Sequence, residues 1–242
     1  DGHGIFRLQQ YAKRITENGI NLHPQMKLLQ DAPAIALLHG DNAIGHLVMH
    51  KATMLAIEKA KKVGIGWVGC SYSNHAGAAS TYANLVAEAG LVGLYLAVGS
   101  ANHMAPWGGI DMLLSTNPIA ISVPTGPGNP PVTLDMATTV AAYGKVKMKA
   151  QQGEQMPVGW MIDKQGKPLT DPNRSHEGML LPIGDYKGYG LSLMIALLAG
   201  CMNGAAVGSK LVDFNADSQA VTNTGQTVVA INPDFLGGTA HL

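Results

Sequence analysis

Short connections between the expected strands most constrain the fold of this chain. Residues 119–123 and 132–134 each form a short apolar segment that is typical of a strand. The connection between them is shorter than the dozen or more residues that a crossover between parallel strands requires. Helix-like and strand-like segments also follow one another without the regular order of a βαβ fold. We therefore expect an α/β fold of the α+β kind, built on a mixed, mostly antiparallel sheet.

Hydrophobic periodicity predicts the remaining elements. A helix is expected over residues 4–17, and Asn18 and Gly19 end it. Further helices are expected over residues 43–63, 77–89, 137–151 and 191–206. Strands are expected over residues 65–70, 91–98, 119–123, 132–134, 159–163 and 227–231, with loop and a short strand over 20–40. Because the period changes after residue 64, we divide the chain into a helical region, 1–64, and a second region, 65–242.

The composition indicates a globular protein and argues against two classes of partner. Of the 242 residues, 46% are hydrophobic and 13% are charged, and the formal net charge is zero. Such a chain offers no electrostatic reason to bind nucleic acid or an anionic membrane. The longest apolar run, residues 191–200, is about half the length that a bilayer requires, so we expect a buried helix there.

Cysteine usage and surface composition bear on compartment and assembly. Cys70 and Cys201 lie in apolar runs outside any C-x-x-C motif, which predicts buried free thiols in a reducing compartment, the cytoplasm. The low charge, with 30 Gly and 12 Met residues, suggests that another subunit covers part of the surface. The chain starts without Met, and we expect both of its ends to be incomplete.

A stripe of three polar side chains lies near the start of the chain. His3, Arg7 and Tyr11 follow one another at intervals of four, which places them on one face of a helix. An imidazole exchanges protons near neutral pH, and a guanidinium binds a carboxylate with two hydrogen bonds. The stripe suits a site that binds a small 2-oxo or 2-imino acid and protonates it; a solvated helix face is the alternative.

Residues 74–79, with the sequence NHAGAA, lie between an expected strand and an expected helix. Backbone N–H groups at a helix N-terminus bind anions, and the small side chains let a ligand come close. His75 suits proton transfer or substrate contact. The alternative is that Asn74 caps the helix and His75 only packs against its neighbours.

Two charged residues lie at expected element boundaries. Asp135 follows a strand and precedes a helix, where it either caps that helix or lies beside a bound ribose or phosphate. Lys187 opens an apolar helix, a place that the helix dipole makes unfavourable for a cation. A bound phosphate or carboxylate would offset that cost; otherwise Lys187 is an exposed, mobile side chain.

The common nucleotide and metal motifs are absent from the sequence. Gly188 and Gly190 are the nearest fragment of a G-x-G-x-x-G fingerprint, and they lack its third glycine. His46 and His50 are four residues apart on an expected helix, but no third ligand is evident. A metal-dependent hydrolase therefore stays a minor alternative, and we expect no metal.

Taken in order, several blocks of the sequence resemble the type 2 malate/L-lactate dehydrogenase family of NAD(P)-dependent oxidoreductases. The matching blocks are residues 2–8 (GHGIFRL), 73–79 (SNHAGAA), 105–109 (APWGG), 116–120 (TNPIA), 135–138 (DMAT), 157–160 (PVGW) and 180–191 (LLPIGDYKGYGL). These blocks extend over nearly the whole chain. The resemblance implies a non-Rossmann cofactor domain over residues 65–242, a substrate and dimerisation region over 1–64, and a homodimer.

The resemblance also implies roles for individual residues. His3 is similar to the residue that donates a proton to the substrate, Arg7 to the one that binds its carboxylate, and Tyr11 lies on the same wall. In some members a second histidine, here His75, has the acid/base role. The positions that correspond to cofactor-binding residues are Ser100, Asp135, Met136, Ala137 and Lys187.

The expected reaction is hydride transfer between NAD or NADP and C2 of a small 2-oxo acid, with a 2-hydroxy acid such as malate or lactate as the reduced form. Reduction of a cyclic imino acid and a cofactor-binding homologue with impaired catalysis are the alternatives. One departure from the family bears on this choice: Gly2 stands where relatives often have Ser, so a hydroxyl contact to the substrate is missing.

Overall fold

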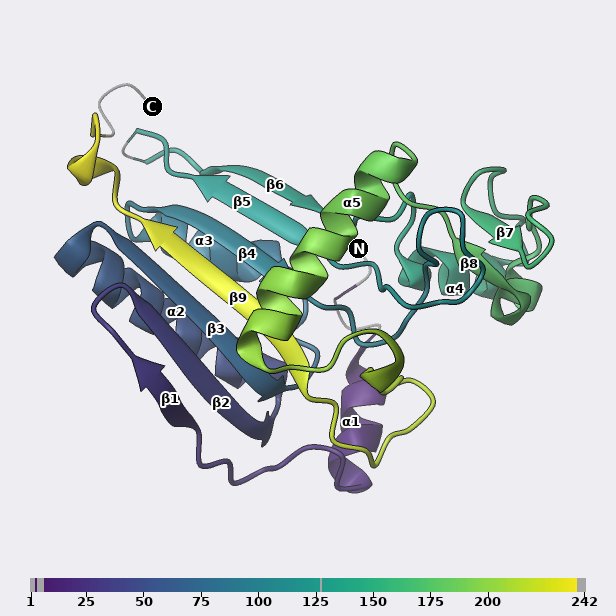
Figure 1. Cartoon of the computed structure of the whole chain (residues 1–242), viewed down its shortest axis with the longest axis horizontal. Coiled ribbons are helices and arrows are strands. Elements are labelled where there is room, and N and C mark those ends of the chain that lie inside the picture. The colour runs from purple at the N-terminus through teal and green to yellow at the C-terminus, as the bar shows by residue number, and fades with distance from the viewer. Residues whose placement is uncertain (1–2, 4–6, 127, 239–242) are drawn as a thin grey trace.

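The computed structural model describes residue 3 and residues 7–126 and 128–238. Its centre is a seven-stranded sheet (Figure 1). From edge to edge, the strands are β1 (Lys27–Asp31), β2 (Ile35–Ala43), β3 (Ile65–Ser73), β9 (Thr224–Ile231), β4 (Val92–Ala97), β5 (Ile119–Val123) and β6 (Val132–Met136). Strand β9, which comes last in the chain, thus lies in the middle of the sheet.

The sheet is mixed and mostly antiparallel, as expected. Strands β2 and β3 are parallel because helix α2 (Gly45–Val63) crosses over between them. Every other neighbouring pair in this sheet is antiparallel. The short connection between β5 and β6 produces the expected antiparallel pair, in which Ile119 lies opposite Met136.

Helices cover both faces of the sheet (Figure 1). On one face lie α2 and α3 (Ser80–Glu88), whose buried residues, among them Met49 and Tyr82, pack with Val228 of β9 in the main core. Helix α5 (Tyr186–Ile195) crosses the other face and continues as a π-helical turn. There Ile195 packs against Leu96 of β4.

A smaller unit lies beside the end of the sheet (Figure 1). It consists of helix α4 (Tyr143–Gln152) and a two-stranded sheet of β7 (Met161–Asp163) and β8 (Gly178–Leu180). Val146, Met161 and Leu180 form its separate core. Helix α1 (Leu8–Thr16) lies at the same end of the large sheet as this unit.

Several element boundaries differ from those expected. The helix expected over 77–89 begins at Ser80, because Gly77 has a positive φ of 76° and the chain before it is not helical. The helix expected over 137–151 begins at Tyr143, because the backbone of Thr138 and Val140 bonds to other segments. The helix expected over 191–206 begins at Tyr186. Residues 20–40 contain β1 and the first part of β2 rather than one short strand.

The first part of the chain contributes to the sheet as well as helices. Strands β1 and β2 both lie before residue 64 and pair with each other, and β2 also pairs with β3, which lies after it. The division into regions 1–64 and 65–242 stays a prediction. Of the two free thiols, Cys70 is buried as expected, but Cys201, the first residue of the short 3-10 turn Cys201–Asn203, is exposed. No helix within the described residues has the length and apolar character needed to cross a bilayer.

Candidate active site

A cavity of about 940 Å³ lies where α1, the segment before α3 and the ends of β4, β6 and β9 meet. Residues that are far apart in the sequence line it. They include His3, Arg7, His46, His75, Ala76, Gly77, Ser100, His103, Asp135, Met136, Ala137, Tyr143, Phe214, Asn215, Thr224 and Gln226. The volume lies in the usual range for sites that bind small molecules and cofactors.

His75 and Tyr11 form a hydrogen-bonded pair at this cavity. The Tyr11 hydroxyl lies 2.6 Å from Nδ1 of His75, and the backbone N–H of Gly77 lies 3.3 Å from the same nitrogen. Desolvation raises the pKa of Tyr11 to about 12, so the phenol keeps its proton near neutral pH. Desolvation and the neighbouring cationic groups hold the pKa of His75 well below 6.5, so this ring is neutral at pH 7.

His3 lies beside His75. The two rings are nearly parallel, with centroids 5.3 Å apart and an angle of 12° between their planes. His3 keeps an exposed surface, yet desolvation of its ring, together with the charge of Arg7, lowers its pKa. The site therefore contains two imidazoles in contact, one held by Tyr11 and one open to solvent.

Arg7 brings a guanidinium to the same cavity. Its Nη1 donates a 2.8 Å hydrogen bond to Oε1 of Gln10, and its Cζ lies 6.0 Å from the centroid of the Phe214 ring. Desolvation lowers the pKa of Arg7, but a guanidinium keeps its charge at all ordinary pH values. His3, Arg7 and Tyr11 thus lie around His75, although α1 begins only at Leu8, so that Arg7 is its N-cap residue and His3 lies before the helix.

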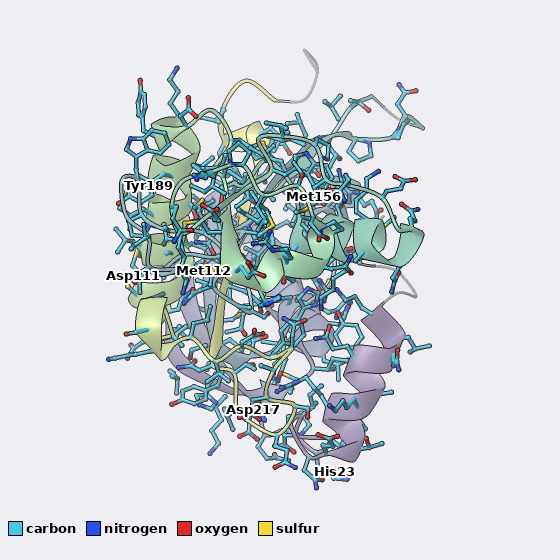
Figure 2. All side chains as sticks on the ribbon, turned by 90° about the vertical axis from the view of Figure 1, so that its right-hand side faces the viewer. His23, Asp111, Met112, Met156, Tyr189 and Asp217 are labelled. Carbon is cyan, nitrogen blue, oxygen red and sulfur yellow. The ribbon has the colours of Figure 1, made fainter. Side chains whose placement is uncertain are left out.

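Buried hydrogen bonds fix helix α1 relative to His75. Arg14, one turn after Tyr11, is buried and donates to Oδ1 of Asn74 at 3.1 Å and to the backbone oxygen of Gly19 at 2.7 Å. It also donates to the backbone oxygen of Asp217 at 2.8 Å. Figure 2 shows Asp217 at the same end of the molecule as α1. Asn74 is part of this buried network and does not cap the following helix.

The anion site expected at the start of α3 binds a carboxylate of the protein itself. Oδ2 of Asp135 accepts a 2.9 Å hydrogen bond from the backbone N–H of Ser80. Asp135 therefore caps α3, which precedes it in the chain, rather than the helix that follows it. This contact places the end of β6, with Met136 and Ala137, at the wall of the cavity.

The predicted cofactor residues differ in their relation to the cavity. Ser100, Asp135, Met136 and Ala137 line it. Lys187 lies in the first turn of α5, as expected, but it is exposed and does not belong to the lining. Its cofactor role stays a prediction that depends on the resemblance and on the unfavourable place of a cation at the start of a helix.

Two buried polar atoms test whether the cavity suits a cofactor. Oγ1 of Thr224 and Oε1 of Gln226 have no hydrogen-bond partner among the described residues, and both residues line the cavity. A buried polar atom without a partner is costly, so such atoms are retained where a ligand or water supplies one. The amide N–H and hydroxyl groups of a nicotinamide nucleotide are donors that fit such a lining. Ser100, Asp135, Met136 and Ala137 would hold it.

The structure adds site residues that the sequence interpretation missed. Phe214 has its ring 5.4 Å from that of His75, and His46 contacts the Tyr11 ring edge to face at 5.3 Å. His103 stacks on Tyr143 at 4.1 Å. Their only sequence signal is residue type, since nothing local relates these positions to residues 3–11. Within the described part of the chain, no three His, Cys, Asp or Glu side chains are grouped as a metal site would require.

Comparisons with known proteins agree with this geometry. The family model described as malate/L-lactate dehydrogenase matches residues 1–242. A malate dehydrogenase of Pyrococcus abyssi is 40% identical over 229 residues, which cover 91% of this chain and 62% of that protein. A ureidoglycolate dehydrogenase (NAD(+)) of Escherichia coli is 38% identical, with 98% of this chain and 67% of the relative covered.

A solved structure is also similar. The sulfolactate dehydrogenase of Methanocaldococcus jannaschii matches with a TM-score of 0.89 and 39% identity, covering 99% of this chain and 68% of that one. The chain thus spans roughly two thirds of the length of such relatives, and 62% of the Pyrococcus abyssi protein. On the match over its whole length, the chain belongs to the malate/L-lactate dehydrogenase family.

Proposed function

We propose that this chain carries the active site of an NAD(H)-dependent oxidoreductase that interconverts a small 2-hydroxy acid and its 2-oxo acid. The observation that carries the proposal is the convergence of His75, His3 and Arg7 on one cavity, with Tyr11 hydrogen-bonded to His75. The names of the relatives support it, since they include malate, sulfolactate and ureidoglycolate dehydrogenases. The proposed cofactor is NAD or NADP.

In the proposed reaction, Arg7 binds the substrate carboxylate through a pair of hydrogen bonds and so orients C2. His75, neutral at rest, takes the proton of the C2 hydroxyl on Nε2 during oxidation and returns it during reduction. For Nε2 to take that proton, the neutral ring carries its hydrogen on Nδ1 and donates it to the Tyr11 oxygen 2.6 Å away, and the same hydrogen bond persists when the ring is protonated. The bound nicotinamide supplies the hydride chemistry at C2.

His3 is the other candidate for the proton donor. Its ring contacts His75 and also reaches solvent, which suits the exchange of protons between the site and water. We assign the direct proton transfer to His75, because its hydrogen bond with Tyr11 fixes the ring. Separate substitutions of the two histidines distinguish these roles.

The test of the proposed function has two stages. Nicotinamide fluorescence on addition of NADH or NADPH measures cofactor binding, and turnover is then measured with oxaloacetate, pyruvate and a cyclic imino acid. Turnover of a 2-oxo acid supports the proposal, and turnover of the imino acid alone favours the reductase alternative. Binding without turnover favours the impaired homologue, and an activity lost on chelation favours the hydrolase.

We also propose a homodimer. Large apolar side chains are exposed on and beside α5, including Tyr186, Met194 and Met202, and exposed Trp107 contacts Tyr186 edge to face at 6.4 Å. Exposed apolar surface of this kind is typical of a subunit interface. Light scattering coupled to size-exclusion chromatography tests this; a monomeric mass at micromolar concentration would contradict it.

A cytoplasmic location completes the proposal. Cys70 and Cys201 are free thiols, which is typical of proteins in a reducing compartment. Cell fractionation of the native protein tests the location, and recovery in an oxidising compartment would contradict it.

A further inference from the structure

Phe214 is the one residue of the loop before β9 whose ring lies against His75. The two rings are parallel to within 6°, and their centroids are 5.4 Å apart. The Phe214 side chain is almost fully buried, with 4% of its surface exposed, and it lines the cavity. An apolar ring in this position excludes water from the imidazole that it covers.

Phe214 also contacts two other predicted site residues. The Arg7 guanidinium lies over its ring, with Cζ 6.0 Å from the centroid, a distance at which a cation is attracted to an aromatic face. Its backbone N–H donates a 3.2 Å hydrogen bond to the backbone oxygen of Ser100. A single residue therefore contacts the proposed acid/base, the proposed carboxylate ligand and a proposed cofactor position.

The residues on either side of Phe214 hold it in place. Oδ1 of Asp213 accepts hydrogen bonds from the backbone N–H and the side-chain amide of Asn215, at 2.8 and 2.9 Å. Oδ1 of Asn215 in turn accepts from Nε2 of Gln10 at 2.7 Å and from Nζ of Lys147 at 3.3 Å. These hydrogen bonds connect the loop to α1 and to α4, so the Phe214 ring is fixed relative to both helices.

We propose that Phe214 is a positioning residue, which fixes the ring plane of His75 and the place of the Arg7 guanidinium and keeps water from the imidazole. The role in catalysis depends on the proposed function of His75, whereas the contact with the ring does not. Loss of the aromatic ring then has two separate effects. Water reaches His75, and the proton-transfer geometry becomes less defined.

The first measurement follows His75 itself. In the Phe214→Leu variant we expect the NMR titration of His75 to move upward toward the 6.5 of a free imidazole, because water stabilises the charged ring. A His75→Gln variant assigns the signal. Phe214→Tyr keeps the ring and should titrate like the wild type. A His75 titration that is identical in the wild type, Phe214→Leu and Phe214→Tyr would overturn the proposal.

The second measurement follows turnover. For Phe214→Leu we expect kcat to fall about 10- to 100-fold, the cost of a misplaced catalytic group, with a smaller change in KM and unchanged NADH binding. The low-pH limb of the oxidation profile should move upward with the NMR titration. Wild-type kcat and an unmoved pH profile in a folded Phe214→Leu protein would overturn the proposal.

Matched variants separate this role from a general loss of stability. Phe235 is 58% exposed and packs near Gly64, away from the cavity, so Phe235→Leu should leave both measurements unchanged. If Phe214→Leu does not fold, Phe214→Met takes its place, because its unbranched, flexible side chain fills an irregular space without an aromatic face. If the wild type has no turnover but the His75 titration moves, the positioning role stands and the proposed function fails.

Discussion

The Tyr11 hydroxyl lies 2.6 Å from Nδ1 of His75, although 64 residues separate them in the chain. Tyr11 belongs to α1, and His75 follows strand β3. The buried contact between Arg14 and Asn74 joins the same two segments one turn farther along α1. The Arg14–Asn74 contact thus holds α1 against the segment that contains His75. The Tyr11–His75 contact, which we propose takes part in catalysis, forms beside it.

Removal of the Tyr11 hydroxyl should reduce turnover more than stability. In Tyr11→Phe the ring and its contact with His46 remain, but Nδ1 of His75 loses the hydroxyl and keeps only the 3.3 Å contact with the Gly77 N–H. We expect kcat to fall about 10- to 100-fold, in the range for a group that assists acid/base catalysis. The free energy of unfolding should fall by only about 1 kcal/mol.

Steady-state kinetics and urea unfolding of the same samples check this prediction. Tyr186→Phe is the matched control, because Tyr186 is exposed on α5 and does not line the cavity. An equal kcat in Tyr11→Phe and in the control would show that the hydrogen bond is not used in the reaction.

Substitution of the two histidines should separate their roles. We expect His75→Asn to abolish most turnover and His3→Asn to reduce it less, with NADH binding retained in both. Because the pKa of His75 lies well below 6.5, wild-type oxidation should stay on its plateau at pH 6.5 and fall only as the ring gains a proton at lower pH. The pH profile of kcat/KM measures this. The opposite ranking of the two variants would make His3 the direct donor, as the family resemblance suggests.

The helical stripe was the part of the site most open to prediction. The period of an α-helix relates Tyr11 to Arg7, the N-cap residue of α1, whereas His3 lies before the helix and reaches the site from there. The short connection between residues 123 and 132 likewise predicts the antiparallel pair β5–β6. Both are local relationships, which a sequence expresses directly.

The remaining site depends on distant pairing, which local patterns do not encode. Strand β9 enters the middle of the sheet between β3 and β4, and this insertion places Thr224 and Gln226 at the cavity. Phe214 reaches His75 from the loop before that strand. Asp135 likewise caps α3, an element 55 residues away, and no spacing rule connects them.

Replacement of Arg7 by Lys should weaken substrate binding. A lysine keeps the positive charge but cannot form the paired hydrogen bonds of a guanidinium. We expect KM for the 2-oxo acid to rise about 10- to 100-fold, the equivalent of one or two charge-assisted hydrogen bonds, with a smaller effect on kcat. Arg174→Lys is the control, since Arg174 is exposed and pairs with Glu177. An unchanged KM in Arg7→Lys would exclude Arg7 as the carboxylate ligand.

Acidification should destabilise the protein partly through His103. Burial lowers the pKa of His103 to about 4, against 6.5 for a free imidazole. Between these two pH values the imidazole is protonated in the unfolded chain and neutral in the folded protein. Stability therefore falls as the pH drops below 6.5, and by pH 5 this one group should account for about 2 kcal/mol of the loss. In His103→Phe an aromatic ring still stacks on Tyr143, but that ring has no titratable group.

Urea unfolding at pH 7.5 and pH 5 measures the effect. The difference in unfolding free energy between the two pH values should be about 2 kcal/mol smaller in His103→Phe than in the wild type. His176→Phe is the control, because His176 is exposed at the surface and does not line the cavity. The comparison uses the change with pH within each protein, so any packing cost of the new ring, present at both pH values, cancels. Equal pH dependence in wild type and His103→Phe would mean that His103 gains its proton in the folded protein as readily as in the unfolded chain.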